Sequence, residues 1–359
     1  MNLLMKATSV LALSAVMATG AEAQQKKQLG KEYPPADEAQ TIIDLKNGIA
    51  ATTKVPLGPN GLAIRTAHTW SHGLVNAKFV VEPNLPKDLQ VGVFKAGATY
   101  EALVRFSNST PNAPKPPDAT PDARGMAVRL VNVPGKKLLD DDKNSTEQDF
   151  VTMSHPTFNS TSAAEFTKFI TTVGNPDKAV VGAYFADPAN KPFFGRVAEA
   201  NIVVTNLLDI PYFSTTPYRF GSNKQKAVKY KIQPSDATKL EVVSTTSPNY
   251  LRENMVNNLS KQDVRFDFMV QFQEDADAQP IEDPTIEWKT PFVKVATIII
   301  PKQVFDTPEL NTMAENMTFN PWHSLEAHQP LGGINRARKT VYEAMQKIRH
   351  EQNHVPAAK

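Results

Sequence analysis

The residues of this chain whose side chains can do chemistry gather first in its N-terminal third, in short β-type runs that Pro, Asn and Gly interrupt. They are one imidazole, one hydroxyl and three guanidinium groups, those of His68, Ser107, Arg65, Arg105 and Arg124. Each lies among apolar neighbours, and buried polar groups need hydrogen-bond partners. Several such groups in neighbouring strands predict one shared site.

These residue types suit two kinds of chemistry. An imidazole can act as general acid and general base near neutral pH, and the guanidinium of arginine matches a carboxylate with its fork of donors. Ser107, at an alternating position of its strand, could orient the imidazole. Two plainer alternatives stay open: His68 is a satisfied core or surface residue, and the arginines are solvated strand edges.

A second pair of residues lies near the C-terminus. Arg338 and Tyr342 are four residues apart on a predicted helix, so the two side chains share one face and can touch. A neighbouring cation favours the phenolate form of a tyrosine, and tyrosinate is one of the ligands by which proteins hold haem iron. The alternative is an ordinary surface contact between the two side chains.

Taken in order along the chain, these residues resemble the signatures of the haem catalases. The matching runs are Arg65-x-x-His68, Val104-Arg105-Phe106-Ser107, Asp122-x-Arg124-Gly125 and Arg338-x-x-x-Tyr342. The run Pro330-Leu331-Gly332-Gly333-Ile334-Asn335-Arg336-Ala337-Arg338 is closer to the small catalase-related proteins. The resemblance covers about residues 60–345, and the C-terminal helical extension of the large catalases is missing.

The resemblance implies haem b as the iron cofactor and a role for each matching residue. Tyr342 is the expected iron ligand on the proximal side of the haem, with Arg338 as its stabilising neighbour. His68 is the expected acid/base on the distal side, hydrogen-bonded to Ser107. Arg65 and Arg105 are expected to bind the haem propionates, and Gln148 is expected to supply the distal carboxamide. Phe158 and Phe166 are expected to pack near the haem. Asp122 and Arg124 are expected to shape the channel and the haem edge. Trp70, which the catalase pattern lacks, either narrows the pocket or fills the core.

The function that the resemblance implies is haem-dependent decomposition of hydrogen peroxide by a catalase or peroxidase, as in the response to oxidative stress. Two alternatives stay open: a haem enzyme acting on organic or fatty-acid hydroperoxides, and a non-catalytic haem- or lipid-binding member of the fold. The allene oxide synthase relatives tend to carry a hydroxyl residue before the distal histidine. This chain has Ala67 there, so peroxide decomposition is favoured. A homo-oligomer is left open.

Composition limits the compartment and the partners. Residues 1–23 have a basic start at Lys6, an apolar stretch and the small-residue pattern Ala21-x-Ala23, as in a cleaved signal peptide, which predicts a periplasmic or secreted protein. No later apolar run approaches 18 residues, so we expect no membrane span. The net charge is +2 with scattered Lys and Arg, which argues against nucleic-acid binding. The absence of cysteine excludes disulfides and thiolate ligands.

The patterning predicts an α+β protein, and the resemblance makes its core a catalase-like antiparallel β-barrel with surrounding helices. Strands are expected near 76–82, 101–107, 126–133, 149–153, 226–232, 264–272 and 295–300, and helices from Asp37, over 162–173, 192–207 and 250–259, and from Gly333. The five prolines of 111–121 and the turn-rich 208–225 indicate loops. The expected layout is a signal peptide (1–23), a flexible arm (24–36), one catalase-like haem-binding domain (37–350) and a tail (351–359).

Overall fold

The structure is a computed structural model that describes residues 26–52, 56–58, 61–139, 144–222, 225–235 and 239–355. The predicted signal peptide lies outside the described residues. Part of the predicted arm is held by the body, because the Gly30 amide donates to Gln273 Oε1 at 2.7 Å and the Tyr33 amide to Glu282 Oε1 at 2.8 Å. Within the described ranges, no helix has both the length and the apolar character needed to cross a bilayer.

Eight antiparallel strands form a closed barrel. They are β1 (Trp70–Val81), β2 (Thr99–Asn108), β3 (Arg124–Leu130), β4 (Gln148–Met153), β5 (Tyr212–Phe213), β7 (Ala227–Pro234), β8 (Val264–Phe272) and β9 (Phe292–Ile300). Their order is β5-β4-β3-β2-β1-β9-β8-β7. The two-residue strand β5 closes the ring because it pairs with both β4 and β7. A further short strand, β6 (Tyr218–Arg219), pairs with β7.

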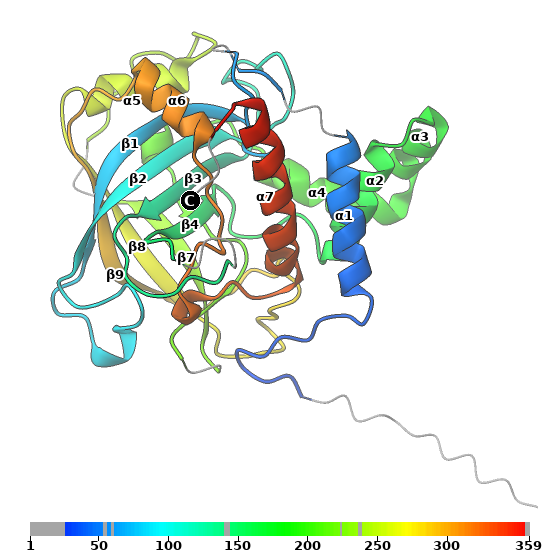
Figure 1. Cartoon of the computed structure of the whole chain (residues 1–359), viewed down its shortest axis with the longest axis horizontal. Coiled ribbons are helices and arrows are strands. Elements are labelled where there is room, and N and C mark those ends of the chain that lie inside the picture. Colours follow the sequence, from blue (N-terminus) through cyan, green and yellow to red (C-terminus); the bar gives the residue numbers. More distant parts are fainter. Residues whose placement is uncertain are drawn as a thin grey trace, which may run out of the picture.

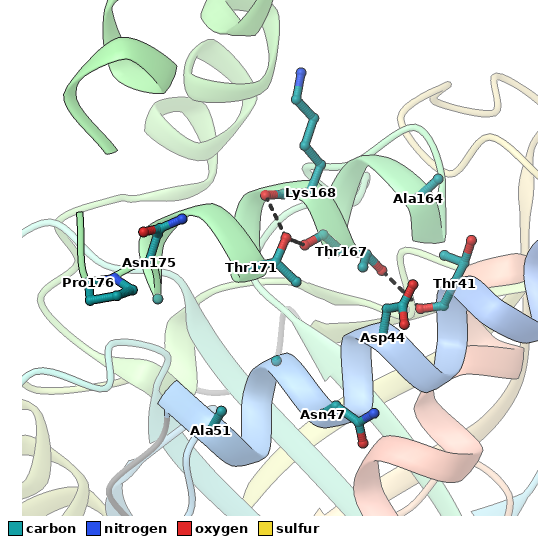
Figure 2. Close-up of a pocket in the computed structure, with 12 residues that line it drawn as sticks. Thr41, Asp44, Asn47, Ala51, Ala164, Thr167, Lys168, Thr171, Asn175 and Pro176 are labelled. Atoms are coloured by element: carbon teal, nitrogen blue, oxygen red, sulfur yellow. Dashed lines mark hydrogen bonds between the residues drawn. The ribbon is translucent and has the colours of Figure 1, made fainter. Parts of the chain in front are cut away.

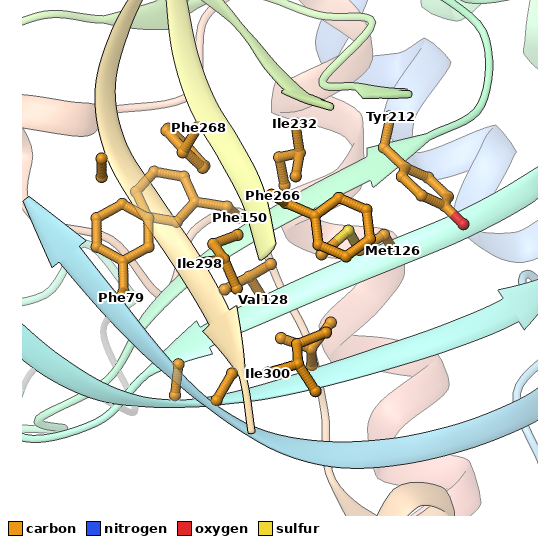
Figure 3. Close-up of a cluster of buried hydrophobic side chains, with 14 of the residues drawn as sticks. Phe79, Met126, Val128, Phe150, Tyr212, Ile232, Phe266, Phe268, Ile298 and Ile300 are labelled. Carbon is orange, nitrogen blue, oxygen red and sulfur yellow. The ribbon is translucent and has the colours of Figure 1, made fainter. Parts of the chain in front are cut away.

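The barrel interior is a packed hydrophobic core. Figure 3 shows the rings of Phe79, Phe150 and Phe268 gathered inside the barrel, and the Phe150 and Phe268 centroids are 4.8 Å apart in an edge-on contact. On β2 and β3 the buried apolar residues inside are Val104, Phe106, Met126, Val128 and Leu130. Because side chains alternate along a strand, the residues between them face the outer wall. This alternation puts Arg105, Ser107 and Gly125 outside the barrel.

Helices cover the outside of the barrel. They are α1 (Glu38–Thr52), α2 (Ala163–Val173), α3 (Lys178–Ala186), α4 (Lys191–Ala200), α5 (Tyr250–Leu259), α6 (Pro308–Asn316) and α7 (Gly333–Gln352), with short 3-10 turns at 87–89, 188–190, 207–209 and 326–328. In Figure 1, α7 runs along the barrel beside β3 and β4, and α1 and α2 lie beyond it. One apolar cluster joins these three helices: Leu45, Ala163, Ile334, Ala337 and Val341.

The elements agree closely with the expectations from sequence. All seven expected strands and all five expected helices are present. The helix expected over 192–207 ends at Ala200, because the chain must then become extended so that Ile202 can exchange main-chain hydrogen bonds with Asp122. Patterning missed α3, which is apolar on nearly every side and therefore lacks a helical period. It also missed α6, although Thr307 caps this helix and Pro308 begins it.

Candidate active site

The outer wall of β2, β3 and β4 carries two rows of neighbouring residues. The first row is Arg105, Ala127 and Val151, and the second is Ser107, Gly125 and Met153. Arg105 and Ser107 are buried, whereas the apolar Ala127, Val151 and Met153 are only partly buried. In Figure 1, α7 runs along the barrel beside β3 and β4, two of the strands that carry these rows.

His68 lies against this wall, just before β1. Its Nδ1 is 3.4 Å from Ser107 Oγ, as the sequence predicted. The His68 carbonyl oxygen accepts from Arg105 Nη1 at 3.0 Å, and the backbone has a left-handed φ of 52°. Gly125 leaves the room for the imidazole: a Cβ atom on Gly125 would lie 2.3 Å from His68 Nδ1 and 2.7 Å from Ser107 Oγ. The Ser107 hydroxyl and the space left by Gly125 therefore position the imidazole, whereas Arg105 holds the main chain at His68.

The surroundings of His68 keep its imidazole neutral. Burial and, after it, the positive charges of Arg105, Arg338 and Arg65 together lower the pKa of His68 to about 4. At neutral pH the ring can therefore accept a proton. Arg338 belongs to α7, so this helix contributes one of the positive charges that lower the pKa of His68.

The close fit at Gly125 gives a first prediction. We expect Gly125→Ala to push the imidazole away from Ser107 and to reduce any His68-dependent turnover by about 100-fold, the usual cost of a 1 Å misplacement. Steady-state kinetics measure this loss. Gly182→Ala is the matched control, because a Cβ there meets nothing within 4 Å, and it should retain full activity. Equal activity of the two variants would show that the position of His68 does not matter.

Arg338 and Tyr342 meet on α7 as predicted. Arg338 Nε donates to the Tyr342 hydroxyl at 3.2 Å, and the guanidinium carbon lies 5.0 Å from the centroid of the phenol ring. Tyr342 is partly buried and packs with Phe158 and Phe166 in the apolar cluster of α1, α2 and α7. Phe158 and Phe166 stand edge to face, with centroids 5.7 Å apart. The two predicted packing residues thus adjoin the predicted iron ligand.

The predicted propionate ligands Arg65 and Arg105 share a largely buried cluster with Arg349 and Glu315. Arg65 donates to the carbonyl oxygens of Ala314 and Met317 at the C-terminal end of α6, where the helix dipole favours a cation. The carboxylate of Glu315 is 3.5 Å from Arg65 Nη1. Burial lowers the pKa of all three arginines, and Glu315 opposes this in each case. Among the described residues, three guanidinium groups therefore share the one carboxylate of Glu315, which leaves two positive charges.

The same cluster has unused hydrogen-bond donors. Within the part of the chain that the structure describes, Arg105 Nε and Arg349 Nε are buried and have no hydrogen-bond partner. A buried donor without an acceptor costs about 1–3 kcal/mol. Two unpaired donors beside two uncompensated positive charges are the features expected of a binding site for a ligand that brings two carboxylates.

Sequence reasoning missed Arg349 and Glu315. Arg349 is seven residues after Tyr342, which is two turns of α7, so the two residues share one helix face. That spacing was the available signal. Glu315 gave no such signal, because it reaches the cluster only through the packing of α6 on the barrel.

The structure corrects the expected role of Gln148. Gln148 pairs with Leu130 at one end of β4, whereas Met153 pairs with Gly125 beside His68. Five residues of strand separate the two positions, roughly 16 Å. The Gln148 amide instead bonds Ser324 Oγ at 3.2 Å and accepts from the Leu325 amide at 3.0 Å. Gln148 is therefore no distal partner of His68.

Arg124 and Trp70 have structural roles. Arg124 faces the opposite side of β3 from Gly125, is fully buried, and donates to the carbonyl oxygens of Asp118 and Thr120. It therefore anchors the proline-rich loop instead of lining a haem edge. The nearby Asp122 likewise accepts from a loop amide, that of Thr110. Trp70 is buried and donates to the Asn112 carbonyl oxygen at 2.9 Å, so it fills the core.

A groove of about 700 Å³ lies elsewhere, between α1 and α2. Figure 2 shows Asp44 and Asn47 of α1 across from Thr167 and Thr171 of α2. The two threonine hydroxyls donate to carbonyl oxygens of their own helix, those of Ala163 and Thr167. None of the predicted site residues lines this groove. The groove is therefore separate from the candidate active site.

Comparison with known proteins gives similarity in structure only. No family model and no curated protein matches this chain. Solved structures of several catalases resemble it over most of its length. A fungal catalase has 17% identity and a TM-score of 0.62, covering 93% of this chain and 67% of its own. Catalase A from Saccharomyces cerevisiae has 17% identity and a TM-score of 0.61, covering 91% and 69%. A bacterial catalase has 16% identity and a TM-score of 0.59, covering 96% and 67%. Likenesses at this level of identity establish the fold and not the activity.

Proposed function

Because this chain has the fold of the catalases, we propose that it binds haem b and decomposes hydrogen peroxide, with Tyr342 as the iron ligand and His68 as the acid/base. The observation that carries the proposal is the grouping of three features at one wall of the barrel. These are the Arg338–Tyr342 pair on α7, the imidazole of His68 and the arginine cluster. The Arg338–Tyr342 pair suits the haem iron, and the imidazole of His68 suits the open face of the haem. The arginine cluster suits the haem carboxylates.

The residues present fit haem b. Its two propionates match the two uncompensated positive charges of the arginine cluster and the unpaired donors of Arg105 and Arg349. Tyr342 would supply the phenol oxygen, and tyrosinate is one of the known ligands of haem iron. Arg65, Arg105 and Arg349 would hold the propionates, and Phe158 would pack beside the ring system. When bound, the haem supplies the redox chemistry of peroxide cleavage.

The protein residues would move the protons. Nδ1 of His68 is directed at Ser107, which leaves Nε2 for the peroxide. Nε2 takes the proton from the near oxygen of the peroxide and returns it to the leaving oxygen, which is general base and then general acid catalysis. The low pKa of His68, about 4, keeps Nε2 able to accept that proton at neutral pH. Arg338 donates to the Tyr342 oxygen and would place a positive charge beside the iron ligand.

Peroxide turnover by the haem-loaded protein tests this function. We expect evolution of oxygen from hydrogen peroxide, or peroxide-dependent oxidation of an added electron donor. A protein that binds haem but does neither would instead be a haem-binding member of the fold. A protein that folds and binds no haem would leave the lipid-binding alternative.

A specific observation favours a second substrate, an organic hydroperoxide. With Gln148 at the far end of β4, the wall beside His68 and Ser107 consists of the apolar Val151 and Met153. An alkyl group gains from contact with such side chains, whereas hydrogen peroxide does not. Turnover of tert-butyl hydroperoxide and of hydrogen peroxide should be compared at equal concentrations. A higher kcat/KM for the organic substrate would support this second function, and a higher value for hydrogen peroxide would support the first.

The arginine cluster gives a second prediction. We expect Arg349→Leu to weaken haem affinity by about 10- to 100-fold, because one charge-assisted hydrogen bond to a carboxylate contributes about 1.5–3 kcal/mol. Haem titration followed by absorbance measures the affinity. Arg196→Leu removes another partly buried arginine, one paired with Glu165, and should bind haem normally. Undiminished haem affinity of Arg349→Leu would remove Arg349 from the site.

We also propose that the protein is exported to the periplasm or secreted after cleavage behind Ala23. The small-residue pattern that ends at Ala23 supports this proposal. Mass spectrometry of the protein from the periplasmic fraction should give a chain that begins at Gln24. An intact Met1 in a protein confined to the cytoplasm would contradict export.

A further inference from the structure

Lys229 is a buried lysine on the outer face of β7 that the proposed function does not use. Side chains alternate along a strand, and its neighbours Val228 and Tyr230 belong to the core inside the barrel. Lys229 therefore points away from that core, yet it is only 4% exposed. Its Nζ donates to the Ile286 carbonyl oxygen at 3.2 Å and lies 5.1 Å from the centroid of the Trp288 ring.

These surroundings favour the neutral amine. Burial lowers the pKa of Lys229 to about 7, and the carboxylates of Asp283 and Glu287 oppose this only in part. About half of the amines are then neutral at pH 7, whereas an ordinary lysine has roughly one neutral amine in 2,500. Only the neutral amine has a lone pair that can attack an electrophile. Lysines in apolar pockets act as nucleophiles for this reason.

Lys229 lies at a small pocket with aromatic walls. These walls are Phe213 on β5, Phe292 on β9 and Trp288 in the segment before β9. The space inside is about 20 Å³, enough for a group the size of a water molecule. Phe213 and Phe292 are partly exposed, whereas Lys229 and Trp288 are buried. A ligand would therefore place a small polar group inside and its apolar part at the phenylalanine rings.

Two further features of the pocket are typical of binding sites. Within the described part of the chain, the buried indole Nε1 of Trp288 has no hydrogen-bond acceptor, and the carbonyl oxygen of a ligand would supply one. Thr215, which also lines the pocket, has a left-handed φ of 59°. It is the middle residue of a tight turn in which the Thr216 amide donates to the Ser214 carbonyl oxygen at 2.6 Å. Such turns are strained in a β-branched residue, and strain gathers at functional sites.

We propose that Lys229 binds a short, uncharged aldehyde as an imine, with the apolar chain of the aldehyde against Phe213 and Phe292. The nitrogen lone pair attacks the carbonyl carbon. The carbonyl oxygen takes up the two protons of the amine and leaves as water, while the C=N bond forms. The step consumes no oxidant or reductant, and water reverses it. An anionic aldehyde is disfavoured, because Asp283 and Glu287 already place negative charge near this amine.

This site is separate from the proposed haem site. The pocket is lined from β5, β7, β8 and the segment before β9, and its lining residues include neither His68 nor Tyr342 nor the arginine cluster. Imine formation at Lys229 needs no haem. A chain that takes up no haem would therefore contradict the proposed function and leave this inference intact.

Reductive trapping of the full chain with propanal tests the inference. Sodium cyanoborohydride delivers a hydride to the imine and leaves a stable secondary amine, which peptide mass spectrometry locates. Lys231 is the internal control, because it is partly exposed and its Nζ lies 5.7 and 5.2 Å from the rings of Phe213 and Phe292. At pH 7 we expect Lys229 to react at least about 10-fold faster than Lys231, a small part of its advantage in neutral amine over an ordinary lysine. Equal or slower reaction of Lys229 would overturn the inference.

Variants and a second probe show whether the pocket is responsible. Lys229→Met should lose the rapid adduct, and Lys231→Met should keep it. In urea, where the pocket is lost, the preference for Lys229 should disappear; a preference that persists in the unfolded chain would contradict a role of the pocket. Glyoxylate, an anionic aldehyde, should show a smaller preference for Lys229 over Lys231 than propanal does. An equal or larger preference would contradict selection of an uncharged aldehyde.

Discussion

Tyr342→Phe is expected to abolish tight haem binding, the largest single effect on the site. The change removes only the hydroxyl that accepts from Arg338 Nε, so the ring still fills its place among Phe158 and Phe166. The iron loses its only proposed protein ligand, and the guanidinium of Arg338 loses its acceptor. The loss of affinity should exceed the roughly 10- to 100-fold that follows removal of an outer-shell partner of a metal ligand. Haem titration and the position of the Soret band measure it.

Tyr100→Phe is the control for this variant. Tyr100 also carries a partly buried hydroxyl, which donates to the Val93 carbonyl oxygen at 3.0 Å. Its loss should not alter haem binding. If Tyr342→Phe keeps both the affinity and the spectrum of the natural protein, the iron ligand is a different residue, and the role of Arg338 fails with it.

His68→Ala should give the second-largest effect, on turnover and not on haem binding. The imidazole is the only group assigned to move the peroxide proton, and loss of general acid–base catalysis typically costs about 10²- to 10⁴-fold. Haem should still bind, since Tyr342 and the arginine cluster are intact. His354→Ala, which removes an exposed imidazole beyond α7, should have full activity. A fully active His68→Ala protein would exclude His68 from the mechanism.

The pH dependence of turnover is a separate signature of His68. The imidazole acts only when neutral, and its pKa is lowered to about 4 by burial and then by the charges of Arg105, Arg338 and Arg65. Activity should therefore stay level from neutral pH to about pH 5 and fall as the pH drops through about 4. An ordinary histidine would lose activity near pH 6.5. Circular dichroism at each pH separates this titration from unfolding.

The predictions that succeeded from sequence rest on local patterns. Alternation along β2 and β3 separates interior Phe106 and Val128 from outward-facing Ser107 and Gly125, so strands and faces could be inferred together. Helical spacing likewise placed Arg338 beside Tyr342. Both rules depend on residues close in the chain, where backbone geometry alone decides which side chains meet.

The predictions that failed depend on how distant segments pack. Gln148 was assigned by counting along the chain, but the register of β4 against β3 decides which end of the strand meets His68. The closure of the barrel through the two residues of β5 has no sequence pattern that could reveal it. Glu315 was not predicted, because it reaches the arginine cluster only through the packing of α6 on the barrel.

Haem titration of the purified mature chain, followed by its absorption spectrum, tests haem binding most directly. We expect saturation at one haem per chain and a ferric high-spin Soret band that Tyr342→Phe loses and Tyr100→Phe retains. A folded chain that takes up no haem, or that takes it up equally well without Tyr342, would contradict the assignment of this wall of the barrel as a haem site.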